Sequence, residues 1–168
     1  VNLHDFLTGP CAAGIFDTNS NRHIVAAYRG VIHMNVKISI RKAEAKGIKL
    51  ELKNVDLTAA KWPSECYQNV ICVFGHFDTE TQKQVLEGIR KSLLNGGWFI
   101  GELYSKEQIK YKTGGPKNIE YLYDPRCILD VFGQDHLHHF YVAEQERQEG
   151  ELHCGKCQVI QYAIQVMK

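Results

Sequence analysis

Short apolar runs and one longer amphipathic stretch alternate in the middle of the chain. Residues Val70 to Phe74 form an unbroken apolar run that ends at Gly75, which is typical of a strand buried on both faces. From Thr79 to Leu94 the apolar residues recur every three or four positions, which predicts a helix of about four turns. Asn95-Gly96-Gly97 ends this helix, and Trp98 to Leu103 predicts a second strand. This order predicts a parallel strand pair joined by a helical crossover.

The same alternation continues upstream. Helices are predicted at Arg22 to Tyr28 and at Ile38 to Lys46, each closed by a glycine. Strands are predicted at Val31 to Val36 and at Ile48 to Leu52. Strands and helices that alternate in this way predict a doubly wound α/β fold, with a mostly parallel sheet and helices on both faces.

The last third of the chain has a different pattern. Cys127 to Phe132 predicts a short helix that is opened by Asp124-Pro125. Phe140 to Val142 and Val159 to Val166 predict two strands, and the polar segment from Glu144 to Glu151 predicts the turn between them. We therefore expect a C-terminal antiparallel hairpin on the otherwise parallel sheet.

Composition narrows the function classes only slightly. The 168 residues are 44% hydrophobic and 23% charged, with a formal net charge of +1, so no strong field attracts nucleic acid or an anionic membrane. No apolar run is long enough for a membrane-spanning helix, and no repeat or linker divides the chain. We therefore expect one domain over residues 1–168. The first residues lack the pattern of a secretory signal and the six cysteines are scattered, which predicts reduced thiols and a cytoplasmic location.

Several ordered motifs resemble those of the class I S-adenosylmethionine-dependent methyltransferases. Lys37 to Gly47 is similar to the helix after the family's second strand, and Asn54 to Leu57 is similar to the loop after its third strand. Leu94 to Ile100 resembles the glycine-containing entry to a later strand. Lys110 to Pro116 and Gly150 to Gly155 are similar to a bacterial subgroup related to tellurite-resistance and thiol methyltransferases. The resemblance covers residues 37–168.

The resemblance implies an enzyme that moves a methyl group from S-adenosylmethionine to a small soft or anionic acceptor. Such a transfer needs orientation and desolvation more than a protein nucleophile, so no catalytic residue is assigned. The implied donor-binding residues are Asp17, Asn35, Asp56, Leu57, Phe74, Gly75 and His76. The implied acceptor-side residues are Glu102, Tyr104 and Tyr111. With the composition, this predicts a small-molecule partner, no nucleic acid or membrane, and a monomer or weak homodimer.

The first third departs from the family pattern. In an ungapped register, Ile15 to Ser20 falls on the first strand and its G-x-G-x-G loop, yet this segment contains no glycine. Glycine matters there because the backbone must approach the ligand closely. The same register places Met34, or Asn35 with one gap, where an acidic residue accepts hydrogen bonds from the ribose hydroxyls. An alternative alignment takes Gly9 to Gly14 as a displaced glycine loop.

Several candidate residues also have a purely structural interpretation. His76 either caps a loop or lies beside the transferred methyl group, and Glu102 is either a solvated strand end or an acceptor-side carboxylate. Tyr104 and Tyr111 suit core or lid packing as well as substrate contact. Cys154-Gly155-Lys156-Cys157 has the spacing of zinc ligands, but no second such pair accompanies it, so no metal site is assigned.

Three functional hypotheses follow from these patterns. The first is an active methyltransferase with a rerouted donor loop. The second is a catalytically impaired, methyltransferase-like protein that binds a ligand or partner. The third is a metal-binding or redox protein that uses the terminal histidines and cysteines.

Overall fold

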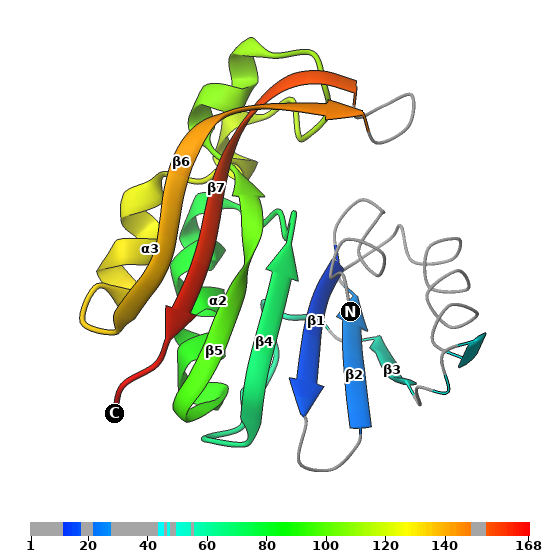
Figure 1. The fold of residues 1–168 in the computed structure, drawn as a ribbon, viewed down its shortest axis with the longest axis vertical. Coiled ribbons are helices and arrows are strands. Elements are labelled where there is room, and N and C mark those ends of the chain that lie inside the picture. Colours follow the sequence, from blue (N-terminus) through cyan, green and yellow to red (C-terminus); the bar gives the residue numbers. More distant parts are fainter. Residues whose placement is uncertain are drawn as a thin grey trace.

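A single sheet with helices against one face organises the described part of the chain. The computed structural model describes residues 12–17, 22–27, 44, 45, 47, 50–54, 56–148 and 154–168. Its strands are β1 (Ala12–Asp17), β2 (Arg22–Ala27), β3 (Leu50–Asn54), β4 (Tyr67–Val73), β5 (Leu93–Tyr104), β6 (His136–Gln148) and β7 (Cys154–Gln165). Its helices are α2 (Thr79–Ser92) and α3 (Pro125–Phe132), with 3₁₀ helices η2 (Lys106–Lys110) and η3 (Ile119–Tyr121). The strands form a seven-stranded sheet in the order β3-β2-β1-β4-β5-β7-β6 (Figure 1).

The strand directions determine which strand ends share an edge of the sheet. β2 pairs in parallel with β3, and β4 pairs in parallel with β5. β1 is antiparallel to both β2 and β4, and β7 is antiparallel to both β5 and β6. The same edge of the sheet therefore holds the carboxyl ends of β2, β3, β4, β5 and β6, whereas β1 and β7 run the opposite way. We call it the functional edge, because it carries the candidate site described below.

The central strand, helix and strand form as the apolar pattern predicts. α2 begins after Asp78, whose carboxylate accepts a hydrogen bond from the Thr81 backbone N–H at 3.0 Å. The helix ends at Ser92, two residues before the predicted end, because the fully buried Leu93 already belongs to β5. The predicted parallel pairing of β4 and β5 is confirmed.

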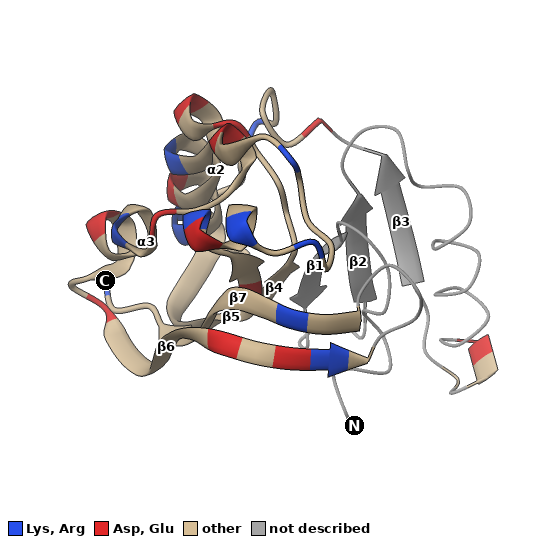
Figure 2. Cartoon of the chain, turned by 90° about the horizontal axis from the view of Figure 1, so that it is seen from above, with Lys and Arg blue, Asp and Glu red and all other residues tan. Residues whose placement is uncertain are grey.

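The main core lies between the sheet and the two helices. α2 and α3 lie on the same face of the sheet, as Figure 2 shows from above. α2 buries Val85 and Ile89 against this face. Phe132 of α3 stacks on Phe99 of β5, with ring centroids 4.9 Å apart. These contacts hold β4 and β5 firmly, and their carboxyl ends carry the candidate site.

The prediction of a helix at Arg22 to Tyr28 is wrong, because Arg22–Ala27 is strand β2 and pairs with β1. Only residues 18–21 separate the two strands. A connection of this length can join antiparallel strands, whereas parallel strands need a crossover of about a dozen residues or more. β3 confirms the strand predicted at Ile48 to Leu52, shifted by two residues. The predicted strand Val31 to Val36 lies outside the described residues, as does most of the predicted helix Ile38 to Lys46.

The C-terminal hairpin is confirmed and is longer than predicted. β6 continues to Gln148, so the charged residues from Glu144 onward extend the strand instead of forming the turn. Charged side chains fit there because the burial along this part of β6 alternates between half-buried and exposed positions. In Figure 1 the far half of the β6–β7 hairpin curves over the carboxyl ends of β4 and β5.

The helix predicted at Cys127 to Phe132 is confirmed as α3, with Asp124 as its N-cap. The Asp124 carboxylate accepts hydrogen bonds from the Arg126 guanidinium at 2.7 Å and from the Arg126 backbone N–H at 3.0 Å. These bonds lower the pKa of Asp124 to about 2. Because the pKa is lower than in the unfolded chain, ionised Asp124 stabilises the fold above about pH 4, and this contribution is lost as the pH falls to about 2.

We therefore expect Asp124→Asn to be less stable than the wild type near neutral pH, with the difference shrinking between about pH 4 and pH 2. Urea unfolding of both proteins across this pH range measures the difference, and an NMR titration of the Asp124 carboxyl gives its pKa directly. A difference in stability that stays constant down to pH 2 would contradict the assignment.

None of the helices in the described ranges has the length and apolar character that crossing a bilayer requires.

Candidate functional site

The loop after β4 is the most distinctive feature of the functional edge. Phe74, Gly75 and His76 follow β4 directly, and doubly wound folds bind ligands in the crevice at this edge. Phe74 has a φ of 51°, which is rare for a residue other than glycine. Its backbone N–H donates to the Glu102 carbonyl at 2.8 Å, which ties the loop to the end of β5. Backbone strain of this kind is often found at functional sites.

Gly75 lets this loop pack closely against Cys72 and Phe77. A Cβ atom there would lie 2.7 Å from the Cys72 sulfur and 3.3 Å from the Phe77 ring, so a larger residue would force these side chains to move. The Gly75 carbonyl accepts a hydrogen bond from the buried Tyr123 hydroxyl at 2.9 Å. The loop after β4 is therefore fixed from both sides, and this fixes the position of His76.

Aromatic side chains stack below and beside the loop. The Phe74 ring lies 4.5 Å from the Tyr104 ring, with an interplanar angle of 19°. The half-buried His76 ring is almost parallel to Tyr104, at 5.9 Å and 4°. Its Nδ1 lies 3.3 Å from the Tyr121 carbonyl oxygen. Tyr104 is only 1% exposed, so it supports the stack from within the core, whereas His76 reaches the surface.

A polar cluster above the stack joins three strands. Arg147 of β6 forms an ion pair with Glu102 of β5, and both side chains are mostly buried, at 14% and 13% exposed. Gln161 of β7 donates to the other Glu102 oxygen at 2.7 Å. The Arg147 guanidinium also lies 5.8 Å from the centroid of the Phe74 ring, within the range of a cation–π contact. Glu102 is therefore no solvated strand end but the centre of a polar network.

The loop after η2 is attached to the hairpin. Tyr111 donates to Glu144 at 2.8 Å, and Lys156 forms an ion pair with the same carboxylate at 2.7 Å. The bond to Glu144 raises the pKa of Tyr111, and the bonds from Lys156 and Tyr111 lower the pKa of Glu144. Thr113 donates to the Lys156 carbonyl. The loop from Tyr111 to Thr113 is thus held against the outer half of the hairpin.

The loop after β3 is only partly available to a ligand. Asp56 uses one carboxylate oxygen to accept from the Thr58 N–H at 3.0 Å and the Thr58 hydroxyl at 2.7 Å. Leu57 is 4% exposed and packs in the main core, so its side chain does not line the crevice. Asp56 stays a candidate donor contact at this edge, and Leu57 could contribute only its backbone, because its side chain lies in the core.

The structure does not bring Asp17 to the functional edge. β1 runs against β4, so Ala12 pairs with Val73 at the carboxyl end of β4, while Phe16 pairs with Asn69 near its start. Asp17 follows Phe16 and therefore lies toward the opposite edge. Asn35 lies outside the described residues. Gly14 is a strand residue paired with Ile71, so it cannot belong to the displaced glycine loop of the alternative alignment.

Cys154 and Cys157 do not form a joint site. They pair in register with Gln148 and Gln145, three residues apart on a regular strand, so their side chains point to opposite faces of the sheet. Among the residues that the structure describes, no three His, Cys, Asp or Glu side chains are placed to hold a metal ion. Neither the metal nor the redox hypothesis receives support from this geometry.

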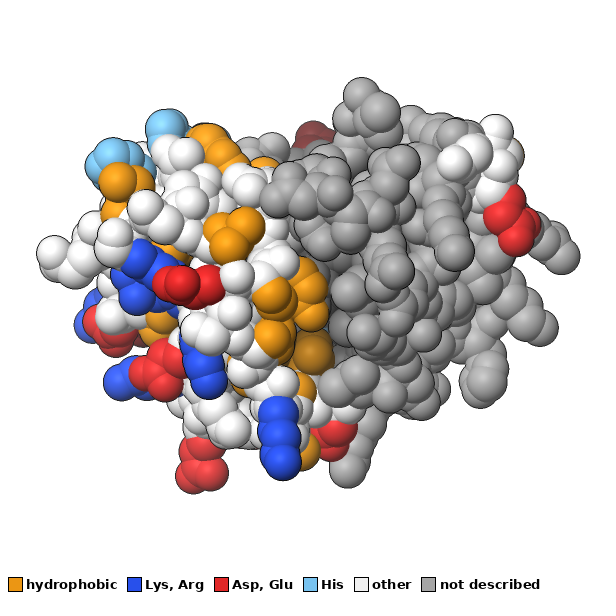
Figure 3. Space-filling view, turned by 90° about the horizontal axis from the view of Figure 1, so that it is seen from below, with side chains coloured by type: hydrophobic (Ala, Val, Ile, Leu, Met, Phe, Trp, Pro, Cys, Tyr) orange, Lys and Arg blue, Asp and Glu red, His pale blue; other side chains and the backbone are white. Residues whose placement is uncertain are grey.

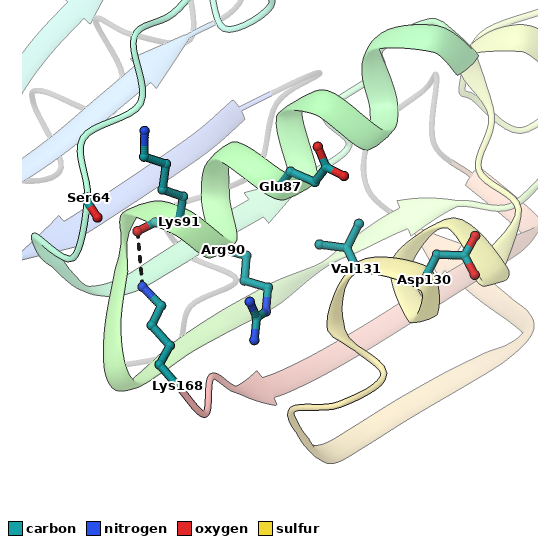
Figure 4. A pocket seen from close by; sticks show the side chains of 7 residues that line it. All are labelled: Ser64, Glu87, Arg90, Lys91, Asp130, Val131 and Lys168. Carbon is teal, nitrogen blue, oxygen red and sulfur yellow. Dashed lines mark hydrogen bonds between the residues drawn. The ribbon is translucent and has the colours of Figure 1, made fainter.

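A depression of about 460 Å³ lies at the other end of the molecule, between the last turn of α2 and α3 (Figure 4). Two of the cationic side chains that line it, Arg90 and Lys168, already bind other groups of the protein. Arg90 binds Asp135 through two hydrogen bonds of 2.7 and 3.0 Å, which raises the pKa of Arg90. The Lys168 ammonium donates to the carbonyls of Lys91 and Leu93 at 3.2 and 2.7 Å. These groups stabilise the end of α2, so we place the ligand site at the opposite edge.

Similarity to known proteins is found at the level of the fold and not of the sequence. No family model matches the sequence, and no curated protein matches it. Solved structures do match. A SAM-dependent methyltransferase from Methanosarcina mazei aligns with a TM-score of 0.58 at 11% identity, covering 86% of this chain and 82% of that one. The chain has the class I methyltransferase fold.

Other methyltransferase structures match equally well. TehB from Haemophilus influenzae gives a TM-score of 0.65 at 9% identity, covering 85% of this chain but 49% of its own. An S-adenosylmethionine-dependent methyltransferase from Clostridium acetobutylicum gives 0.57 at 12% identity, covering 86% and 75%. The present chain thus spans about half the length of TehB.

The class I methyltransferase fold allows a test of whether the donor fits. In doubly wound folds a glycine-rich loop at the carboxyl end of the first strand lets the backbone approach the nucleotide. β1 occupies the position of that strand, but its carboxyl end lies at the opposite edge. Within the described ranges, β1 contributes no glycine loop at the edge where the loops after β3 and β4 lie.

Residues of the polar cluster were missed by sequence reasoning. Glu102 was a candidate, but Arg147 and Gln161 lie 45 and 59 residues away along the chain. The alternation of side chains along β6 and β7 predicts the face of the sheet on which each residue lies. Their approach to Glu102 depends on the register between β6, β7 and β5, which the sequence pattern does not provide.

Proposed function

We propose that this chain binds S-adenosylmethionine at the carboxyl edge of its sheet and promotes methyl transfer to a small soft or anionic acceptor. The observation that carries the proposal is the strained, rigidly held loop Phe74-Gly75-His76 at the end of β4 in a class I methyltransferase fold. The donor-side contacts in this proposal are Asp56, Phe74, Gly75 and His76. Glu102 and Tyr111 belong to the acceptor side, with Tyr104 supporting them from the core.

Methyl transfer from a sulfonium needs a positioned acceptor and little water. S-adenosylmethionine would supply the activated methyl group. The rings of Phe74 and Tyr104 and the side chains of Leu122, Cys157 and Val159 form an apolar cluster below the crevice, which limits the access of water. The half-buried ring of His76 lies 5.9 Å from the Tyr104 ring of this cluster, and we assign His76 to the orientation of the reactants.

The orientation of β1 favours a second candidate function. Among the described residues, β1 brings no glycine loop to the ligand edge, so a donor bound there gains no backbone contacts from such a loop. A methyltransferase-like protein that binds its ligand or a partner without turnover would tolerate the lack of these contacts. The two candidates differ in a measurable way, because only the first forms a methylated product.

Calorimetric titration with S-adenosylmethionine and with its demethylated product tests the proposal. We expect a dissociation constant in the micromolar range, corresponding to about 8 kcal/mol. His76→Ala should weaken binding about tenfold, or about 1.4 kcal/mol. His136→Ala, an exposed histidine at the start of β6, is the matched control and should bind as the wild type does.

The outcomes separate the two candidates. Binding together with methylation of a small thiol supports the enzyme, and binding without any methylated product supports the ligand-binding protein. An absence of heat with both ligands at millimolar concentration would exclude donor binding, and with it the proposed methyl transfer.

A further inference from the structure

The outer side of β6 carries an exposed apolar segment. Among the residues that the structure describes, β6 pairs with β7 along one side and with no strand along the other. Along this strand Leu137, Tyr141 and Val142 are 40%, 44% and 40% exposed. Figure 3 shows histidines next to hydrophobic side chains at one corner of the surface. An edge strand of this kind offers free backbone N–H and C=O groups for pairing with another strand.

The polar side chains along β6 select the direction of that pairing, because imidazole can hydrogen-bond to a carboxylate whereas two carboxylates repel each other. Exposed histidines occupy its first part, at positions 136, 138 and 139, and Glu144 and Glu146 occupy its last part. A second copy aligned in parallel would place like groups side by side. A second copy aligned antiparallel places the histidine end of one strand beside the glutamate end of the other. The strand is therefore complementary to an inverted copy of itself.

The side chains also select a register. With the twofold axis at Tyr141, the two Tyr141 residues face each other, Phe140 faces Val142, and His139 faces Ala143. All of these residues follow the bulge between Leu137 and His139, so the strand is regular over this segment. Tyrosine and β-branched residues that face each other across antiparallel strands are favourable pairs.

Other positions of the twofold axis give less favourable residue pairs. With the axis at Val142, Phe140 faces Glu144, and with the axis at Ala143, His139 faces Arg147. With the axis at Glu144, the two Glu144 carboxylates face each other. Because paired residues must share a face of the sheet, an axis between two residues is not possible. Of these four positions, Tyr141 is the axis that keeps charged groups apart from like charges and from apolar partners.

We propose that β6 pairs with β6 of a second copy of this chain, antiparallel and centred on Tyr141, to give a weak homodimer. Only a few residue pairs take part, so the contact is at the small end of specific interfaces and forms at micromolar to millimolar concentration. Neither Tyr141 nor the residues that face each other around it are donor or acceptor contacts in the proposed methyl transfer, so this proposal does not depend on that one.

Sedimentation equilibrium and light scattering of the wild type between about 10 μM and about 1 mM test the dimer, a range chosen for a weak interface. We expect the mass to rise toward twice the 19.2 kDa of one chain. Tyr141→Lys should remain monomeric, because a lysine blocks edge pairing. Ile119→Lys, at a position with the same 44% exposure on η3, is the matched control and should dimerise as the wild type does.

Cross-linking tests the register. In a background with Cys11 and the exposed Cys66 and Cys154 replaced by serine, Tyr141→Cys should form an intermolecular disulfide on mild oxidation. Facing residues of antiparallel strands have Cα atoms about 4.5–5.5 Å apart, within the range of a disulfide. Ile119→Cys should not cross-link. A monomeric wild type at 1 mM, or a dimer that survives Tyr141→Lys in a folded variant, would overturn the proposal.

Discussion

Alanine in place of Gly101 is expected to destabilise the fold by about 3 kcal/mol or more, a large share of the stability of a small protein. Gly101 lies in the middle of β5, between β4 and β7. A Cβ atom there would fall on the backbone carbonyl of Cys72 and lie 2.6 Å from the Tyr162 hydroxyl. The Cys72 carbonyl belongs to a central strand and cannot move without breaking the pairing of β4. Urea unfolding followed by circular dichroism measures the loss.

Two further variants isolate the cause. Tyr162→Phe removes the hydroxyl, so Gly101→Ala combined with Tyr162→Phe relieves one contact and leaves the clash with the Cys72 carbonyl. We expect this double variant to remain strongly destabilised. Ile100→Val, one residue away on the other face of β5, should cost about 1 kcal/mol, as such substitutions usually do. If Gly101→Ala unfolded at the same urea concentration as the wild type, the close approach of β5 to β4 would be wrong.

The sequence was most informative where one element gives a complete local signal. The apolar run before Gly75 and the periodic pattern from Thr79 onward predict β4 and α2 because buried strands and amphipathic helices leave characteristic patterns. Asp124-Pro125 predicts α3 because the cap and the proline act within one turn. These elements fix the edge on which the candidate site lies.

Strand direction was the part that local patterns could not supply. The segment from Arg22 to Ala27 was predicted as a helix, although Ile24 and Val25 are β-branched and favour a strand. Whether this segment forms a strand depends on its pairing with β1 and β3, and the local sequence pattern does not reveal that pairing. The reversal of β1 then moves Asp17 away from the site, a result that no residue pattern within β1 indicates.

The polar network at the site shows the same limit. Glu102 was identified from its place at the end of a strand, but the residues that neutralise it come from the two terminal strands. Their approach follows from the curvature of the β6–β7 hairpin over the sheet edge, visible in Figure 1. This curvature depends on the whole sheet and not on the sequence of one strand.

Glu102→Ala is expected to destabilise the protein by about 3 kcal/mol, the low end for breaking a buried ion pair. The substitution leaves the Arg147 guanidinium mostly buried, at 14% exposed, without its carboxylate. Urea unfolding gives the difference in stability. The matched control is Arg126→Ala, which removes an ion pair whose cation is 83% exposed, and its effect should be much smaller.

A double-mutant cycle separates the ion pair from simple packing. Glu102→Leu and Arg147→Leu should each destabilise the protein, while the double variant should recover much of the loss, because apolar residues can replace a buried pair. Arg147 also lies against the Phe74 ring, so breaking its ion pair with Glu102 should loosen the hairpin above the loop after β4. Hydrogen exchange at the amides of Cys157 and Val159 should therefore rise in Glu102→Ala but not in Arg126→Ala. If hydrogen exchange at these amides rose equally in Glu102→Ala and Arg126→Ala, the Glu102–Arg147 ion pair would not be what holds the hairpin over the site.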